Sequence, residues 1–411
     1  MDNKKNGIPK LRFPGFTGAW EQRKITELGK IYIGLVTTMT EHYVNKGTLL
    51  IRNSDIKEGK FEFGENPIFL DESFSEKNKS RMHQIGDVIT VHTGDIGTSA
   101  VITEREANSI GFATIVTRPK KEVISSQYLC TFLNTEQHKK WALSVSTGDG
   151  RNNYNLKDYY RLRVPTPSIE EQQCISDFVG NLDTLITLHQ RKLEHLQEQK
   201  KGLLQKMFPK NGEVVPEVRF PGFTDDWEQR KLGDFIIEFH EKTTVNDQYP
   251  ILTSSRKGIF LQTDYYSGNQ IASKDNTGYN IVPFGYFTYR HMSDDNIFRF
   301  NINKIVDKGI VSTLYPVFTT NKYLDSRYLQ IQLNHGNEFA KYALLQKQGG
   351  SRTYMYLSKL KKLVLTMPNS ISEQKTISNF FDTLDNLITL HQRKLEHLEL
   401  MKKGLLQQMF V

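Results

Sequence analysis

Two stretches of the chain carry a sustained pattern of apolar and polar residues that predicts two long helices. Apolar residues recur in each at alternating spacings of four and three, the heptad pattern of helices that pack along a seam. The first seam consists of Ile175, Val179, Leu182, Ile186, His189, Leu193, Leu196, Lys200, Leu203 and Met207. The second consists of Ile377, Phe381, Leu384, Ile388, His391, Leu395, Leu398, Lys402, Leu405 and Met409. Eight of the ten positions are apolar in each seam, so we expect the two helices to pack on each other.

Each predicted helix has a start signal. Ser168 and Glu171 form a capping-box sequence just after a proline, and Ser370 and Glu373 repeat it. The Ser hydroxyl and the Glu carboxylate are both expected to bind free amide groups of the first turn. The heptads alone leave the orientation of the two helices open. We expect antiparallel packing, because it sends the two intervening segments to opposite ends of the helix pair, whereas parallel packing sends both to one end.

Three segments of the sequence each occur twice along the chain, in the same order. The duplicated segments are RFPGFT at residues 12–17 and 219–224, WEQRK at 20–24 and 227–231, and LITLHQRKLEHL at 185–196 and 387–398. Between them lie two inserts, roughly 26–167 and 233–369, of similar length and little mutual resemblance. A constant frame with different inserts suits a protein that makes one contact twice and recognises two different things. The alternative is a tandem duplication whose middle parts have drifted.

The inserts predict compact α+β domains. Short β-rich runs broken by glycine turns, such as Gly86 to Val91, precede a helical pattern at 126–144 in the first insert. The second has a strand candidate at 281–289 and a helix candidate at 326–345. The predicted fold is therefore two globular α/β domains separated by a pair of long antiparallel coiled-coil helices. The repeat also continues from the C-terminus into the N-terminus, so we expect the two ends to meet in a pseudo-two-fold, pseudo-circular object.

Four segments follow from these patterns. They are a first domain at 1–167, a first spacer helix at 168–208, a linker and second domain at 209–369, and a second spacer helix at 370–411.

Polar and aromatic clusters lie at the expected turns of both inserts and are candidate DNA contacts. In the first insert they are Arg52, Asn53, Ser54, His92, Thr93, Arg151, Asn152, Asn153 and Tyr154. In the second they are Ser254, Ser255, Arg256, Lys257, Tyr289, Arg290, His291, Arg352, Thr353 and Tyr354. Arg, Asn, Ser and Thr pair with base edges, and Lys with the phosphate backbone. A solvated loop explains any single cluster more simply, so only the recurrence in both inserts favours DNA.

Charge and composition narrow the class of protein. The formal net charge of +8 is spread among interleaved acidic and basic residues, which fits a folded protein with a polyanionic partner or an ordinary, mildly basic one. The two cysteines, Cys130 and Cys174, form no CxxC pair, so neither a disulfide framework nor a zinc site is expected. The sequence shows no signal peptide and no apolar run of about 18 residues, so we expect a cytoplasmic protein outside the membrane.

Candidate catalytic chemistry is lacking. Neither a GxxxxGK[ST] phosphate loop nor a GxGxxG turn after a strand occurs. Asn66-Pro67-Ile68-Phe69 lacks the second proline of the adenine methyltransferase motif and is interpreted as a loop. His189 and His391 could be metal ligands, but a polar layer that sets the register of the helix pair is the favoured interpretation. We therefore expect no catalytic residues, no metal site and no cofactor in this chain.

The junctions between inserts and helices resemble the specificity subunits of type I restriction-modification systems. The resemblance rests on Asn155-Leu156-Lys157-Asp158, then Leu162 to Pro167, then Glu171-Gln172. The second copy keeps Leu363 to Pro368 and Glu373-Gln374 but has Leu357-Ser358-Lys359-Leu360 in place of the Asn-Leu-Lys-Asp run. Ile51 to Ile56 and Gly86-Asp87-Val88 also resemble recognition domains of that family.

The resemblance implies a non-catalytic subunit that reads a bipartite target in double-stranded DNA, one half per insert. The helix pair would fix the unread gap and bind two methyltransferase subunits, and motor-nuclease restriction subunits would join that core. S-adenosylmethionine, ATP and magnesium would belong to those partners. Two rival interpretations remain: a coiled-coil scaffold that joins two protein-binding domains without touching DNA, and a self-sufficient nuclease or methyltransferase.

Overall fold

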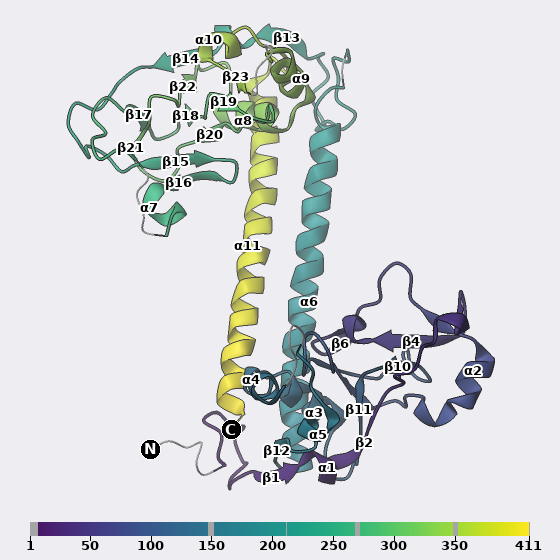
Figure 1. The fold of residues 1–411 in the computed structure, drawn as a ribbon. Helices are drawn as coiled ribbons and strands as arrows, with labels where there is room; N and C mark the ends of the chain where they lie inside the picture. Colours follow the sequence, from purple (N-terminus) through teal and green to yellow (C-terminus); the bar gives the residue numbers. More distant parts are fainter. Residues whose placement is uncertain (1–6, 147–151, 211, 268–271, 348–351, 411) are drawn as a thin grey trace. The chain divides into compact units, whose positions relative to one another are not determined.

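The chain folds into two compact units that share two long helices (Figure 1). The computed structural model describes residues 7–146, 152–210, 212–267, 272–347 and 352–410. Unit 1 contains residues 1–190 and 393–411, and unit 2 contains residues 191–392. The long helices are α6 (Ile169–Lys206) and α11 (Ile371–Met409), and each contributes one half to each unit.

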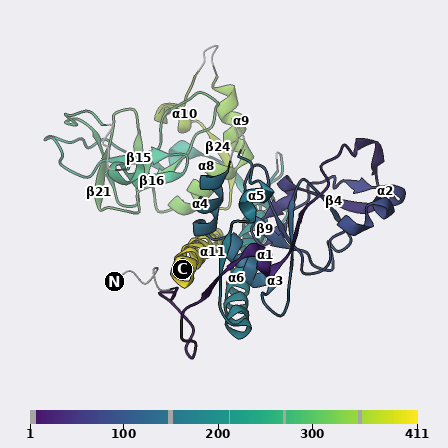
Figure 2. The ribbon, with the colours of Figure 1, turned by 60° about the horizontal axis from the view of Figure 1, so that its bottom comes forward.

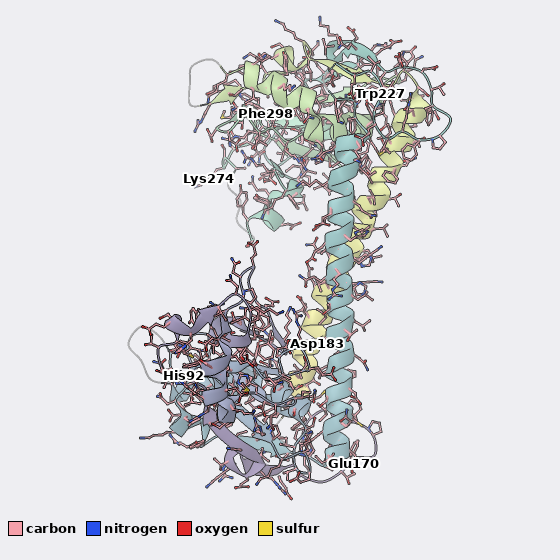
Figure 3. The ribbon with its side chains drawn as sticks, turned by 90° about the vertical axis from the view of Figure 1, so that its right-hand side faces the viewer. His92, Glu170, Asp183, Trp227, Lys274 and Phe298 are labelled. Carbon is pink, nitrogen blue, oxygen red and sulfur yellow. The ribbon has the colours of Figure 1, made fainter. Side chains whose placement is uncertain are left out.

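Within each unit the two helix halves pack antiparallel, as predicted. In unit 1, the Lys402 ammonium of α11 lies 2.5 Å from the carboxylate of Asp183 of α6, which is labelled in Figure 3. The end of α11 reaches back to Ile175 near the start of α6, in the same apolar cluster. In unit 2, Lys200 pairs with Asp385, the repeat-equivalents of Lys402 and Asp183. Each unit therefore makes the same inter-helix ion pair.

Burial along both helices follows the predicted seams. The buried seam residues are Ile175, Val179, Leu182, Leu196, Met207, Ile377, Phe381, Leu384 and Met409. The partly buried ones are Ile186, His189, Leu193, Lys200, Leu203, Ile388, His391, Leu395, Leu398, Lys402 and Leu405. Leu185 and Leu188, which lie off the seam, are 44% and 61% exposed. Within the described part of the chain, no helix combines the length and apolar character that a membrane crossing requires.

The domain of unit 1 is built on two four-stranded sheets. The first sheet is antiparallel, in the order β2 (Gly29–Ile33), β11 (Ile115–Pro119), β8 (Val88–Thr90), β9 (Ser99–Val101). The second has the order β10 (Ile110–Phe112), β4 (Thr48–Arg52), β7 (Phe69–Leu70), β3 (Tyr43–Val44), with β10 parallel to β4. A hairpin joins β5 (Ile56–Lys57) and β6 (Lys60–Phe61). The helices are α1 (Ile25–Leu28), α2 (Glu72–Lys77), α3 (Ser126–Leu133), α4 (Glu136–Val145) and α5 (Leu156–Tyr159).

The domain of unit 2 has a related antiparallel sheet. Its order is β14 (Ile236–Phe239), β22 (Val317–Thr320), β18 (Phe287–Thr288), β20 (Asn301–Ile302). The strand pairs are β15 (Leu252–Ser255) with β16 (Gly258–Leu261), β17 (Asn280–Pro283) with β21 (Lys308–Val311), and β19 (Met292–Ser293) with β23 (Thr353–Tyr354). The helices are α7 (Gln262–Tyr265), α8 (Ser326–His335), α9 (Asn337–Leu345) and α10 (Leu357–Leu360).

Two element predictions for the second insert were too long. The single strand expected at 281–289 is β17 and β18, separated by a turn in which Gly285 has a φ of 84°. The single helix expected at 326–345 is α8 and α9, broken at Gly336, whose extended φ and ψ end the first helix. The helical stretch at 126–144 is likewise two helices, because Thr135 caps α4 by accepting a hydrogen bond from the His138 amide.

The duplicated segments clamp each domain onto its long helix. In unit 1, β1 (Glu21–Lys24) pairs with β12 (Arg163–Thr166). Arg12 donates two hydrogen bonds, of 2.6 and 2.7 Å, to the buried Glu171 carboxylate, and the Trp20 indole donates a third of 3.2 Å. The capping box is thus only half formed. The Ser168 hydroxyl accepts from the Glu171 amide as predicted, but the carboxylate binds the duplicated segment instead of the helix backbone.

Unit 2 repeats this clamp. Here β13 (Glu228–Lys231) pairs with β24 (Val364–Met367). Arg219 donates hydrogen bonds of 2.7 and 2.8 Å to Glu373, and the Trp227 indole donates one of 3.2 Å. Arg219, Trp227 and Glu373 thus repeat the contacts of Arg12, Trp20 and Glu171.

Segments near the two ends of the chain meet in unit 1, as predicted. The amide of Leu11 donates to the carbonyl of Gln408 at 3.0 Å, and the Phe410 ring packs on Trp20 and Tyr128. Figure 2 shows the end of α11 beside α4, where Lys403 lies 2.6 Å from a carboxylate oxygen of α4. In unit 2, Phe208 at the end of α6 packs on Trp227 and Tyr328 in the same way. The pseudo-circular repeat is confirmed at the level of these contacts.

Candidate nucleic-acid interface

Three of the predicted polar clusters come together in unit 1. The Asn53 side chain accepts a hydrogen bond of 2.8 Å from the His92 amide and donates one of 3.1 Å to the Ala113 carbonyl. The Thr93 hydroxyl donates to Asn153 at 2.9 Å, across an isolated β-bridge between these two residues. Burial lowers the pKa of His92, which favours the neutral imidazole. Loops far apart in the sequence thus form one polar surface, with His92 labelled in Figure 3.

Unit 2 brings its three clusters together in the same arrangement. The Met355 amide donates to the His291 carbonyl at 2.7 Å, just as the Tyr154 amide donates to the His92 carbonyl at 2.8 Å in unit 1. The pairing of β19 with β23 places Met292 opposite Tyr354. The Ser254 hydroxyl donates to the Thr288 carbonyl at 3.2 Å, next to the Tyr289 cluster. The frame therefore holds corresponding loops together in both domains, although their residues differ.

Several predicted residues are occupied by structural contacts. Tyr154 and Tyr289 are fully buried, and burial raises the pKa of both phenols. The Tyr154 ring packs on His138 and Tyr159, and the Tyr289 hydroxyl donates to the Met355 carbonyl at 2.8 Å. Both rings belong to the apolar cores of their domains, so they are not available to DNA in this structure.

Three polar members of the predicted set are also buried. They are Ser254, His291 and Thr353, which bind neighbouring backbone or side-chain groups. Arg151 lies outside the described residues. Ser54, Asn152, Arg256, Lys257, Arg290, Arg352 and Tyr354 are exposed, and Arg52, Asn53, His92, Thr93, Asn153 and Ser255 are partly exposed.

Three arginines of these clusters are held by aspartates. Arg52 binds Asp55 through two guanidinium nitrogens, at 3.1 and 2.9 Å. In unit 2, Arg256 pairs with Asp295 at 2.6 Å, and Arg352 pairs with Asp294. The hydrogen bond from Arg256 is the largest cause that lowers the pKa of Asp295 to about 2. The Arg256 and Arg352 pairs are solvent-exposed and therefore weak, so these guanidinium groups can exchange an aspartate for a base edge or a phosphate, whereas Arg52 is held by the buried Asp55.

Sequence patterns missed two groups of residues. Tyr356 stacks on His291 with ring centroids 5.0 Å apart and extends the aromatic surface beside Tyr354. A second group of cations, including Arg299 and Arg327, lies between the domain of unit 2 and the long helices. Nothing in the local pattern marks either group, since each depends on loops that meet only in the fold. The role of Glu171 and Glu373 could have been inferred from their place in a repeated segment.

The fold and these loop surfaces define a class of protein with two different α/β readers on a shared antiparallel helix pair. The sequence matches the family described as "Type I restriction modification DNA specificity domain" twice, at residues 18–198 and 224–400. The chain belongs to this family and carries its DNA-recognition domain in two copies. The coiled-coil scaffold that does not touch DNA is therefore not favoured.

Named relatives span the same architecture. A provisionally named specificity subunit of the type I restriction enzyme MjaX, from Methanocaldococcus jannaschii, is 22% identical over 94% of this chain and 92% of its own length. The MjaVIII specificity subunit of the same organism is 21% identical and covers 70% of each chain. Among solved structures, the type I restriction-modification S subunit from M. genitalium has a TM-score of 0.61 at 13% identity and covers 98% of this chain and 99% of its own. At that identity the last likeness shows the fold alone.

Proposed function

We propose that each domain reads one half of a split target in double-stranded DNA, and that the helix pair fixes the unread gap between the halves. The observation that carries the proposal is the repeated assembly of three polar loops in each domain on one repeated frame. The frame contacts are the same in both units, whereas the loop residues that would face DNA differ. A protein that reads two different half-sites needs different loop residues in its two domains, and it can hold both sets of loops with the same contacts.

The same proposal assigns the catalytic work to other subunits. Two methyltransferase subunits would bind the helix pair, and motor-nuclease subunits would join that assembly. The off-seam leucines of α6 and α11 are candidate contacts, because Leu185 and Leu188 are exposed and Leu387 and Leu390 repeat them at 39% and 47% exposure. S-adenosylmethionine, ATP and magnesium would be held by those partners, and the complex would work in the cytoplasm.

Exchange of residues 233–369 for the matching segment of a relative tests the split of the target. The expected result, read by mapping methylated positions in DNA, is a change in one half of the recognised sequence with the other half retained. The control is the exchange of residues 26–167, which should change the opposite half only. If either exchange changes both halves or neither, the two domains do not read independently.

A further inference from the structure

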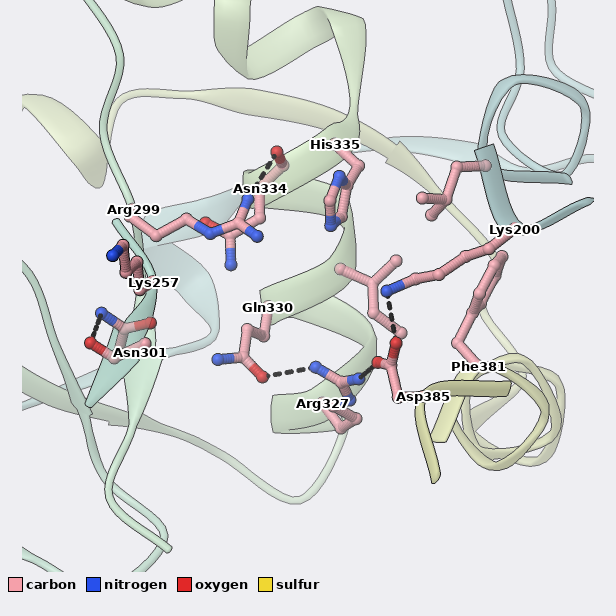
Figure 4. A pocket seen from close by; sticks show the side chains of 13 residues that line it. Lys200, Lys257, Arg299, Asn301, Arg327, Gln330, Asn334, His335, Phe381 and Asp385 are labelled. Carbon is pink, nitrogen blue, oxygen red and sulfur yellow. Dashed lines mark hydrogen bonds and ion pairs between the residues drawn. The ribbon is translucent and has the colours of Figure 1, made fainter. Parts of the chain in front are cut away.

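A small polar pocket lies in unit 2, between the domain and both long helices (Figure 4). Its volume is about 110 Å³, well below the roughly 300 Å³ at which pockets for drug-sized ligands begin. Liquid water takes about 30 Å³ per molecule, so the space equals that of three to four water molecules and suits a small ion or group. Its charged lining comes from α6, α8, α11, the β15–β16 turn and the segment before β20: Lys200, Lys257, Arg299, Arg327, His335 and Asp385.

Positive charge in this pocket exceeds negative charge. Lys200 and Arg327 both bind Asp385, and Arg327 also binds Asp382 at 2.5 Å. Among the described residues, no carboxylate lies within ion-pair distance of Arg299, which donates only a long hydrogen bond of 3.4 Å to the Asn334 carbonyl. Burial, followed by the nearby Arg327 cation, lowers the pKa of Arg299. The Arg299 guanidinium is thus a partly buried cation, and most of its N–H groups have no acceptor among the described residues.

Lys257 adds a second cation, which is exposed to solvent. It lies at the turn of the β15–β16 hairpin and has no ion-pair partner among the residues that the structure describes. His335 is affected by the same charges, because burial and then Arg299 and Lys200 lower its pKa to about 4. A neutral imidazole at pH 7 can donate one hydrogen bond without adding charge.

Unit 1 shows that the shared frame does not require these cations. In unit 1 the Asn134 side chain binds the backbone amide and carbonyl of Ser99. In unit 2 the Asn334 side chain binds the same two groups of Phe300, so Ser99 and Phe300 occupy equivalent positions. Arg299 therefore corresponds to Thr98. Helices α3 and α8 begin after the capping residues Ser125 and Asp325. The second residue of the helix is Gln127 in unit 1 and Arg327 in unit 2.

Other lining positions also differ between the two units. Cys130 donates to the Ser99 carbonyl where Gln330 donates to that of Phe300, and Thr135 stands where unit 2 has His335. The two-residue turn of the β5–β6 hairpin in unit 1 carries Glu58 and Gly59, whereas the β15–β16 turn of unit 2 carries Arg256 and Lys257. The junction in unit 1 thus packs without an arginine at the position of Arg299, so the shared frame alone does not explain this cation.

We propose that this pocket binds a phosphate group, with Arg299 and Lys257 as the groups that hold it. A guanidinium with free N–H donors fits two phosphate oxygens, and a lysine ammonium supplies a point charge beside them. The phosphate has two possible sources, a DNA backbone diester or a free phosphate ion. The first source rests on the proposed function, whereas binding of free phosphate does not.

The test measures binding of inorganic phosphate to the full chain by calorimetry, at constant ionic strength. Arg299→Gln is expected to weaken phosphate binding by at least about tenfold, since a charge-assisted hydrogen-bond pair is lost. Lys257→Gln, on an exposed turn that folding does not depend on, is expected to weaken it as well. The matched control is Arg230→Gln, which removes an arginine of unit 2 that binds Asn369 outside the pocket and should leave phosphate binding unchanged.

A second arm distinguishes the two sources. If the pocket holds a backbone phosphate, Arg299→Gln weakens binding to target and non-target duplexes alike, lowers the slope of log K against log salt by about one, and phosphate competes with DNA. If the source is free phosphate, the variant loses phosphate binding and keeps its DNA affinity. The proposal is overturned if Arg299→Gln changes neither binding, or if Arg230→Gln weakens phosphate binding as much. Failure of the domain exchange would leave the phosphate arm unaffected.

Discussion

The buried carboxylate that joins each domain to its long helix gives a sharp test of what stabilises the fold. In unit 2, Glu373 is 2% exposed and accepts three hydrogen bonds, two from Arg219 and one from Trp227. Glu373→Gln removes the negative charge and leaves the Arg219 guanidinium, whose side chain is 13% exposed, without a counter-ion. Breaking one partner of a buried pair costs about 3–5 kcal/mol. We expect a loss of about 3 kcal/mol, since the amide retains one acceptor.

The assay is urea unfolding followed by tryptophan fluorescence in a Trp20→Phe, Trp141→Phe background, in which Trp227 alone reports on this contact. The control is Glu228→Gln, whose carboxylate is 55% exposed and lies 3.5 Å from Arg230, so its loss should cost no more than about 1 kcal/mol. The pair Arg219→Met with Glu373→Leu should recover part of the loss, since no unpaired charge remains. A loss for Glu373→Gln as small as the control's would refute the clamp as the main link between domain and helix.

Three further predictions follow from other contacts. Asp183→Lys should destabilise unit 1 by about 0.5–1 kcal/mol, because Asp183 is half exposed, and adding Lys402→Asp should restore stability in a double-mutant cycle; additive losses would contradict the ion pair. Burial lowers the pKa of His83 and His138 to about 4 from an ordinary 6.5, so the unfolded chain binds more protons below pH 6.5. The free energy of unfolding of unit 1 should therefore fall by about 3 kcal/mol per histidine between pH 6.5 and 4. Urea midpoints that are equal at the two pH values would refute this. The control His240→Gln replaces an exposed histidine and should not change the loss. Inserting about four residues, roughly one helical turn, between Leu196 and Leu203 should change the gap between half-sites and leave their sequences intact, as read by methylation mapping; an unchanged gap would show that the helices do not set the spacing.

The sequence predicted those parts of the structure that depend on periodicity and repetition. Alternating spacings of four and three located both long helices and their buried seams, and the duplicated RFPGFT and WEQRK segments marked the contacts that both units share. Local patterns overestimated element length where one residue decides the outcome. Gly336 ends α8, and the turn at Gly285 separates β17 from β18.

The candidate interface was predicted less completely, because exposure depends on the packing of distant segments. Tyr154 resembles a loop residue in sequence but is buried against His138 and Tyr159. Tyr356 lies just outside the predicted cluster and is 49% exposed. Arg299 stands between two core phenylalanines and becomes a pocket residue only when α8 and the long helices pack beside it.

The measurement that bears most directly on the whole account is methylation mapping of DNA from cells that carry this chain with the methyltransferase subunits proposed as its partners. Two unlike domains on one helix pair predict a target of two short, different sequences separated by unspecified bases of fixed number. A continuous target, two identical halves, or a gap of variable length would contradict the account.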